Sequence, residues 1–109
     1  MINNDAALFV CMNDENSMVG FMQLYPLFSS TRMKKLWLLN DLFVDENYRG
    51  QGYAVALINQ AKEFCKETRA CGLMLETAKD NMIGNKLYPK TGFSLDTEHN
   101  YYNWSTNTN

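Results

Sequence analysis

The feature that most constrains the fold is a strand, turn, helix and strand in succession near the middle of the chain. From Tyr53 to about Ala70 the apolar residues recur at intervals of three and four, which places them on one face of a helix. The apolar run Leu42–Val44 precedes this helix, and Leu73–Thr77 follows it after Gly72, where the helix is expected to stop. Such a succession most economically forms a right-handed parallel unit. The sequence therefore predicts an α/β fold.

Shorter apolar runs before this unit predict further strands. Ala7–Met12 and Met18–Tyr25 flank a polar cluster and indicate an antiparallel hairpin, which Pro26 is expected to end. Leu27–Lys35 has no clear period and is expected to be a connecting loop. Leu36–Val44 is then predicted to be a third strand.

A second, shorter helix is predicted after the parallel unit. Asp80 or Asn81 can cap its start, and it is expected to run through about Tyr88. Pro89 and Gly92 are expected to bound it on the far side.

The remaining sequence predicts two last strands and a tail. The strands are expected at Phe93–Leu95 and Asn100–Trp104, and the polar residues 105–109 are expected to fray. The chain has 109 residues and shows no internal repeat or linker. We therefore expect a single domain over residues 1–109 with its core in residues 6–104.

Composition narrows the class of protein. Apolar residues make up 46% of the chain and charged residues 20%, as in ordinary globular proteins. The 10 lysines and arginines are nearly matched by 12 aspartates and glutamates, without a basic cluster, so no nucleic-acid partner is expected. The apolar runs are far too short for a membrane helix and the N-terminus lacks a signal pattern, so we expect a cytoplasmic protein without membrane contact.

The cysteines argue against a disulfide framework. Cys11, Cys65 and Cys71 are odd in number and lack CxxC spacing, so neither a disulfide set nor a metal site is expected. They are expected to be buried or partly buried thiols.

The glycine-rich stretch YRGQGYA, Tyr48–Ala54, joins the strand to the helix. The first turn of a helix leaves backbone N–H groups without partners and carries partial positive charge, so a glycine turn there can hold an anion. Arg49 adds a full charge suited to phosphate oxygens. The alternative is that Gly50 and Gly52 only make a tight turn. The spacing fits neither a P-loop nor a dinucleotide fingerprint.

This sequence motif resembles the coenzyme A pyrophosphate loop of the GNAT N-acetyltransferase superfamily. The family motif is Arg or Gln, two residues, Gly, one residue, then Gly or Ala. The stretch Glu76–Phe93, ETAKDNMIGNKLYPKTGF, is similar to the second block of that family. The residues that match the two motifs are Arg49, Gly52, Ala54, Asn81, Leu87, Tyr88, Gly92 and Phe93. The resemblance implies a GNAT-like α/β fold with a mixed, mostly antiparallel sheet, a central parallel strand pair and flanking helices.

The resemblance also implies a ligand and the residues that bind it. Acetyl-coenzyme A would be the co-substrate, without a metal; the loop amides would hold its pyrophosphate, and the strand before the loop, splayed from the next strand, would hold its pantetheine arm. The implied cofactor-binding residues are Leu42, Phe43, Val44, Arg49, Gly50, Gln51, Gly52, Tyr53, Ala54 and Asn81.

Two residues are implied in catalysis. Tyr88 matches the tyrosine that protonates the departing thiolate, and a phenol with an ordinary pKa near 10 can donate at neutral pH. Its alternative is an aromatic packed at a helix end, and Pro89 departs from the family pattern there. Asp41, a carboxylate inside an apolar strand, is the candidate base if partial burial raises its pKa. The alternatives are a bulge at Asn40 and Asp41, a water chain as base, and Glu76 as a weaker candidate base.

One part of the family pattern, at its N-terminal end, has no counterpart in this sequence. Family members usually begin with a strand and a helix pair, where this chain has only Met1–Ala6. We therefore expect an exposed strand edge and a homodimer that covers it. Exchange of C-terminal strands between the two copies is one way to form this dimer. The predicted activity is acetyl transfer to a primary amine of a small molecule or peptide by direct attack in a ternary complex. The alternative is a shortened, non-catalytic homologue that binds coenzyme A or a protein partner.

Overall fold

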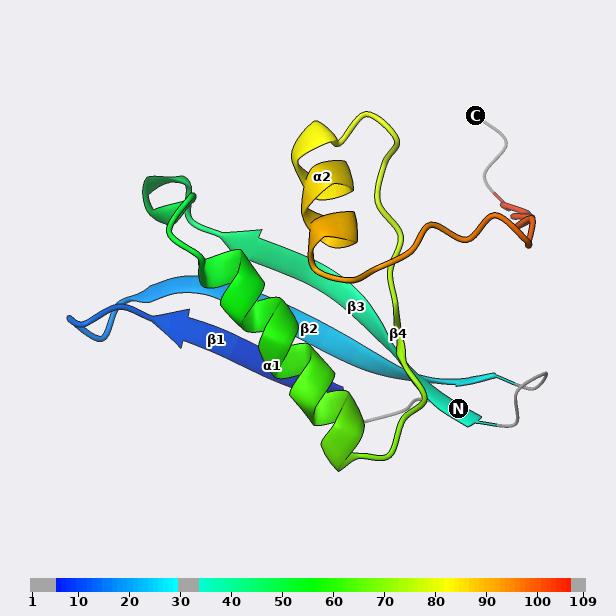
Figure 1. The fold of residues 1–109 in the computed structure, drawn as a ribbon, viewed down its shortest axis with the longest axis horizontal. Helices are drawn as coiled ribbons and strands as arrows, with labels where there is room; N and C mark the ends of the chain where they lie inside the picture. The colour runs from blue at the N-terminus through cyan, green and yellow to red at the C-terminus, as the bar shows by residue number, and fades with distance from the viewer. Residues whose placement is uncertain (1–5, 30–33, 107–109) are drawn as a thin grey trace. The chain divides into compact units, whose positions relative to one another are not determined.

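The computed structural model describes residues 6–29 and 34–106 (Figure 1). Its contacts divide the chain into two units, Met1–Thr77 and Ala78–Asn109, which we describe one at a time.

The first unit is built on a four-stranded sheet. Its strands are β1 (Ala7–Met12), β2 (Met18–Ser29), β3 (Lys34–Val44) and β4 (Leu73–Met74), in the order β1-β2-β3-β4. The first three pair antiparallel, whereas β3 and β4 pair parallel. The predicted mixed, mostly antiparallel sheet with a parallel strand pair is therefore confirmed.

Pro26 does not end the second strand, contrary to the prediction. β2 continues to Ser29, and Pro26 lies opposite Trp37 of β3. Pairing of β2 with β1 reaches only to Leu24, so Pro26 has a described neighbour strand on one side only. A strand tolerates a missing N–H in that situation. The loop predicted over Leu27–Lys35 is thus strand at both ends, and its middle lies outside the described residues.

The central helix is α1 (Tyr53–Glu67), which confirms the amphipathic pattern but not its predicted stop. The chain leaves the helix at Arg69, which has a left-handed φ of 59°, and not at Gly72. The amide of Ala70 reaches back to the carbonyl of Cys65 over 2.9 Å, the hydrogen bond of a Schellman motif.

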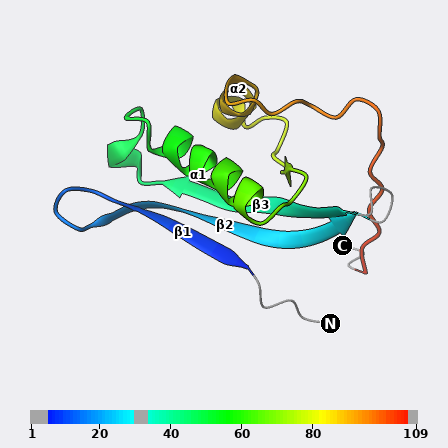
Figure 2. The same cartoon turned by 60° about the horizontal axis from the view of Figure 1, so that its bottom comes forward.

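Helix α1 covers one face of the sheet (Figure 2). The indole of Trp37 lies 4.9 Å from the ring of Phe64, centroid to centroid, and its Nε1 donates to the hydroxyl of Thr68 over 2.9 Å. Phe9 meets Phe64 edge-on at 5.3 Å. Burial of each large apolar side chain contributes about 1.5–3 kcal/mol. The buried apolar residues are Val19, Met22, Leu24, Leu36, Trp37, Leu39, Val44, Leu57, Ile58, Ala61 and Cys65.

The fourth strand is shorter than the predicted Leu73–Thr77. Only Leu73 and Met74 pair with β3, at Trp37 and Leu38. From Leu39 to the end of β3, no described strand pairs with β3 on that side. The parallel pair therefore separates after two residues, as the splayed arrangement requires.

The second unit contains α2 (Met82–Lys90). Pro89 lies inside this helix and does not bound it, contrary to the prediction, whereas Tyr88 is helical, in agreement with it. Pro89 stands in the last turn, where it removes the helical N–H donor to the carbonyl of Asn85. The amide and the hydroxyl of Thr91 both donate to the carbonyl of Leu87 over 3.0 Å.

The two C-terminal strands that the sequence predicted are absent. Neither Phe93–Leu95 nor Asn100–Trp104 forms a strand in the described part of the chain. A strand needs a hydrogen-bonding neighbour strand. Between the two predicted strands, the side chain of Asp96 binds nearby groups of its own segment, which favours a turn. The carboxylate of Asp96 accepts hydrogen bonds from the amide of Glu98 at 2.9 Å and from the hydroxyl of Tyr101 at 2.7 Å.

The cysteines differ in exposure. Cys65 is buried and Cys11 half-buried, as predicted, whereas Cys71 is exposed. Among residues 6–29 and 34–106, no three potential metal ligands cluster together. No helix in the same ranges is long and apolar enough to cross a membrane.

Candidate functional site

A β-bulge interrupts β3 just after β4 leaves it. Gln23 pairs with Asn40 and Met22 with Leu42, so Asp41 is the extra residue. Asp41 has a left-handed φ of 57°, and its carboxylate accepts a hydrogen bond from the Asn40 amide over 3.3 Å. The bulge that the sequence left open as an alternative is therefore present. The partial burial predicted for Asp41 is wrong, because its side chain is exposed.

The bulge sets the direction of the three residues that follow. Val44 is buried on the α1 side, Leu42 is half-buried, and Phe43 points to the opposite face, where its ring lies 5.6 Å from that of Phe21. Their main chains pair with β2 on one side. On the other side no described strand takes their backbone groups. This strand end is thus open for main-chain contacts with a ligand.

A short, anchored loop joins β3 to α1. It contains the 3-10 helix η1 (Glu46–Tyr48). The hydroxyl of Tyr48 accepts a hydrogen bond from the Asn13 amide at 3.1 Å, which ties the loop to the β1–β2 turn. The Nε of Arg49 donates to the carbonyl of Val44 over 2.9 Å, so the guanidinium is held at the end of β3.

The start of α1 is an uncapped helix N-terminus. Gly52 is the N-cap residue, with φ 89°, and no side chain caps the helix there. The first helical hydrogen bond runs from Ala56 to the Gly52 carbonyl at 2.9 Å, so the amides of residues 53–55 have no partner within the helix. The first turn carries no acidic residue. These groups attract an anion.

Both glycines of the loop need left-handed backbone. Gly50 has φ 79° and Gly52 has φ 89°, in the region that other residues rarely adopt. An added Cβ at either position would meet no atom within 4 Å. Packing therefore does not require these glycines, and open space lies beside the backbone where a ligand would approach.

The other predicted loop residues line the same turn. Gln51 is exposed, while Tyr53 and Ala54 are half-buried at the start of α1. The ring of Tyr53 meets that of Tyr48 nearly at right angles, with centroids 6.2 Å apart. The structure thus brings Leu42–Val44 and Arg49–Ala54 together at one end of the Met1–Thr77 unit.

The remaining two predicted residues lie in the Ala78–Asn109 unit. Asn81 is the N-cap of α2, and its side-chain oxygen accepts from the Gly84 amide at 3.1 Å. Tyr88 is half-buried with its ring edge-on to Phe93 at 5.7 Å, and burial raises the pKa of its phenol. This phenol is therefore protonated at neutral pH.

Gly84 is a site residue that the sequence interpretation missed. A Cβ here would lie 2.6 Å from Nδ2 of Asn81 and 3.2 Å from Cε2 of Tyr88. Gly84 thus lets the cap residue and the tyrosine lie close together. The signal was a glycine three positions after a capping Asn, inside a helix where glycine is unfavourable.

Solved structures share this fold. A crystal structure of a probable acetyltransferase superposes with a TM-score of 0.87 at 35% identity, covering 96% of this chain and 70% of that chain. An aminoglycoside acetyltransferase from a soil metagenome superposes with a TM-score of 0.78 at 26% identity, covering 94% of this chain and 68% of its own. The fold is thus that of acetyltransferases.

Sequence comparison gives the same class. The acetyltransferase (GNAT) family model matches residues 1–93. An uncharacterized N-acetyltransferase of Bacillus subtilis is 34% identical over 93% of this chain and 68% of its own length. A probable acetyltransferase of Haemophilus influenzae is 33% identical over 80% of this chain and 63% of its own length. The chain belongs to the acetyltransferase (GNAT) family, which confirms the predicted family and enzyme class.

Proposed function

We propose that this protein transfers an acetyl group from acetyl-coenzyme A to a primary amine of a small cationic molecule. The uncapped start of α1 carries the proposal. It combines free amides at residues 53–55, left-handed glycines with open space beside them, and a first turn without an acidic residue. A pyrophosphate supplies the acceptor oxygens and negative charge that such a helix end favours.

The neighbouring groups fit the rest of the ligand. Arg49 stands beside the turn, and its guanidinium has donors left for phosphate oxygens after Nε binds the Val44 carbonyl. The backbone of Leu42–Val44 has no described strand on the β4 side, which leaves main-chain groups for an extended amide-containing arm. Asn81 remains our proposed second contact to that arm, although its oxygen also caps α2.

The proposed reaction moves one acyl group from sulfur to nitrogen. The neutral amine attacks the thioester carbonyl, a C–N bond forms, the C–S bond breaks, and the thiolate leaves. Tyr88 gives its phenolic proton to that thiolate, and the proton that the nitrogen loses as it becomes an amide returns through water to the tyrosinate. Asp41 attracts the ammonium form of the acceptor and takes its proton through water, because the exposed carboxylate is in contact with solvent.

The acceptor class follows from charge and from the names of relatives. The carboxylate of Asp41, presented by the bulge, suits a cation near the open end of β3. One relative, 41% identical over 58 residues, is named streptothricin acetyltransferase A, and one similar structure is an aminoglycoside acetyltransferase. Polyamines, aminoglycosides and streptothricin are therefore the first acceptors to test, followed by amino acids and lysine peptides.

A pair of glycine variants tests the proposed pyrophosphate site at the start of α1. Gly52→Ala and Gly50→Ala both place a Cβ at a left-handed residue, so each should lower the free energy of unfolding by about 1–2 kcal/mol. Calorimetric titration with coenzyme A should show an affinity loss of at least about tenfold for Gly52→Ala and a smaller loss for Gly50→Ala. Equal losses in both variants, or none in either, would remove Gly52 from the proposed site.

Turnover is tested by thiol release. Acetyl-coenzyme A and each acceptor of the panel are mixed with the full chain, and coenzyme A release is followed with a thiol reagent. We expect acceptor-dependent release that is slowed about 100-fold or more, but still measurable, in Tyr88→Phe. Binding of acetyl-coenzyme A without release across the whole panel would favour the non-catalytic alternative.

A further inference from the structure

Two cysteines lie together where α1 ends and β4 begins, at the far end of α1 from the proposed coenzyme A site. Cys65 is in the last turn of α1, and Cys71 stands in the connection to β4, just before Gly72. Cys65 is only 6% exposed, whereas Cys71 is an exposed residue. The proposed acetyl transfer uses neither thiol.

The main chain brings Cys71 back beside Cys65. The amide of Ala70, which precedes Cys71, donates to the carbonyl of Cys65 over 2.9 Å. The Sγ of Cys65 lies 3.8 Å from the carbonyl oxygen of Gly72, which follows Cys71. Both chain neighbours of Cys71 are therefore in contact with Cys65.

The connection that carries Cys71 is fixed on the sheet and on the helix. The amide of Cys71 donates to the carbonyl of Lys35 over 2.9 Å, and the amide of Trp37 donates to the carbonyl of Gly72 over 3.0 Å. On the helix side, the hydroxyl of Thr68 accepts a hydrogen bond from the indole of Trp37 over 2.9 Å. The folded structure therefore keeps the two cysteines close to each other.

The two thiols differ in their access to solvent and in their chemistry. Burial raises the pKa of the Cys65 thiol, and the nearby charge of Cys71 raises that pKa further. A buried thiol with a raised pKa reacts slowly with reagents in solution, because the thiolate is the nucleophile. Cys71 is exposed and therefore meets such reagents first. Cys65 is then the neighbouring thiol that can attack a modified Cys71.

We propose that Cys71 and Cys65 form a reversible redox pair whose oxidant is a small-molecule disulfide. The Cys71 thiolate attacks one sulfur of that disulfide, a mixed disulfide forms, and one small thiolate leaves. The Cys65 thiolate then attacks the Cys71 sulfur, the protein disulfide forms, and the second small thiolate leaves. Two protein thiols are oxidised and one small disulfide is reduced to two thiols. The protons of the two cysteines pass through water to the released thiolates.

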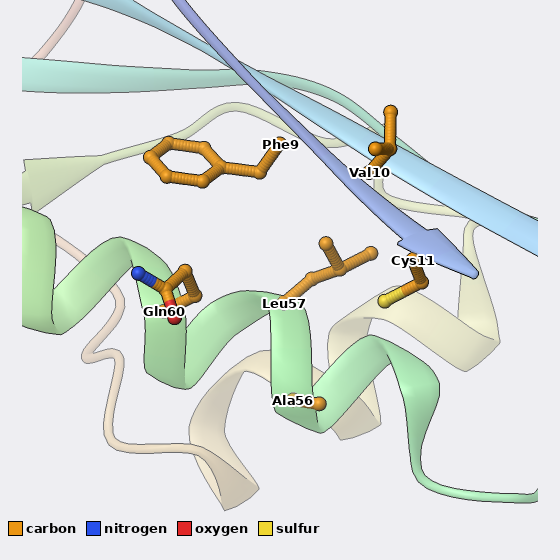
Figure 3. Close-up of a pocket in the computed structure, with 6 residues that line it drawn as sticks. All are labelled: Phe9, Val10, Cys11, Ala56, Leu57 and Gln60. Carbon is orange, nitrogen blue, oxygen red and sulfur yellow. The ribbon is translucent and has the colours of Figure 1, made fainter. Parts of the chain in front are cut away.

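Cys11 lies too far away to take part in this pair. Figure 3 shows its side chain turned toward α1, at the groove that it lines with Ala56 and Leu57. Leu57 and Cys65 are separated by about two turns, or about 12 Å, along the axis of α1. A disulfide needs Cα atoms no more than about 7 Å apart. Cys11 is therefore a control thiol within the same chain.

Incubation of the full chain with oxidised glutathione tests the pair, with alkylation of the remaining thiols and peptide mass mapping as the readout. The native chain should end with a Cys65–Cys71 disulfide and a free Cys11, and a reducing agent should restore all three thiols. Cys65→Ala should stop at a glutathione adduct on Cys71 that persists at least about tenfold longer than in the native chain. Cys71→Ser should consume the reagent at least about tenfold more slowly. Cys11→Ser should form the bridge at the native rate within about twofold.

Mapping of the native chain needs no variant, so the test holds even where Cys65→Ala lowers stability. A lasting glutathione adduct on Cys71 of the native chain would overturn the proposal. So would a bridge that contains Cys11, a bridge between two chains, or three free thiols after the incubation. None of these outcomes depends on coenzyme A binding or turnover.

Discussion

At the scale of single residues, Arg69 carries an avoidable strain. It holds a left-handed φ of 59° at the end of α1, a conformation that costs a residue with a Cβ about 1–2 kcal/mol. Arg69→Gly should therefore raise the free energy of unfolding by about 0.5–1 kcal/mol, after the extra chain entropy of glycine is subtracted. Urea unfolding followed by tryptophan fluorescence measures it. Arg69→Ala keeps the Cβ and should give no such gain.

The three thiols should react at different rates. Burial raises the pKa of the Cys11 and Cys65 thiols, which lowers their thiolate fraction, and Cys65 is also shielded from solvent. Cys71 is exposed. An aromatic disulfide reagent should label Cys71 first, at least about tenfold faster than the other two. Peptide mapping after short exposure checks the order, and first labelling at Cys65 would contradict the packing of α1.

Tyr88 predicts the alkaline side of the pH profile, on the proposed mechanism. Burial raises the pKa of the phenol above its ordinary value near 10. The protonated acid is present below that raised pKa and is lost as the pH rises through it, so kcat should fall only above about pH 10. Steady-state rates measured at saturating acceptor across the alkaline range test this. Tyr88→Phe should lack this limb; a limb retained in that variant would assign it to another group.

At the scale of elements, α2 is shaped by Gly84. Alanine there should gain about 1 kcal/mol of helix propensity but should displace the Asn81 cap, which costs a similar amount. Gly84→Ala should thus leave the free energy of unfolding within about 0.5 kcal/mol of the native value, while it displaces Asn81 and Tyr88 and lowers kcat/KM. Parallel unfolding and thiol-release measurements separate the two effects.

Asn85→Ala is a comparison variant on the same helix. Its side-chain amide donates to the carbonyls of Ala78, Lys79 and Asn81. This variant should lose stability through those bonds with a smaller effect on turnover. If Gly84→Ala lost stability and activity in the same proportion as Asn85→Ala, the role of Gly84 would be structural only.

The elements that the sequence predicted well are those with a strong internal period. The three- and four-residue spacing before Cys65 defined α1, because one face must be apolar to pack on the sheet. Pro26 and Pro89 were misread as breaks, because the cost of a proline depends on its place in the element. Pro26 has a described neighbour strand on one side only, and Pro89 stands in the last helical turn, where only one helical residue follows it. The prediction of two C-terminal strands was wrong for a related reason. Strand formation depends on a neighbouring strand that the local sequence does not specify.

The candidate site was predictable where a backbone conformation requires a particular residue type. Gly50 and Gly52 were found because left-handed turns favour glycine. The exposure of Asp41 was not predicted, because a one-residue bulge moves a side chain from one environment to another without a change in composition. Gly84 was missed because its role depends on a distance across a helical turn.

At the scale of the whole molecule, the apolar core is unevenly distributed. Every buried apolar side chain of the described residues lies between Val19 and Cys65, in the Met1–Thr77 unit. In the described part of Ala78–Asn109, Gly84 alone is buried, and large side chains such as Trp104 are exposed. Since stability follows buried apolar area, the two units should open at different free energies.

Native-state hydrogen exchange should resolve this difference. Amides of β2 and α1 should open at the global free energy of unfolding, and those of α2 at a value lower by about 2 kcal/mol or more. Saturating coenzyme A should slow the exchange of α2 if Asn81 binds it as proposed, because a ligand stabilises the state that it binds. In Gly52→Ala, at the same coenzyme A concentration, that protection should be reduced by about 1.4 kcal/mol or more, while the exchange of ligand-free α2 is unchanged. Equal opening free energies in both units would show instead that α2 unfolds only with the sheet.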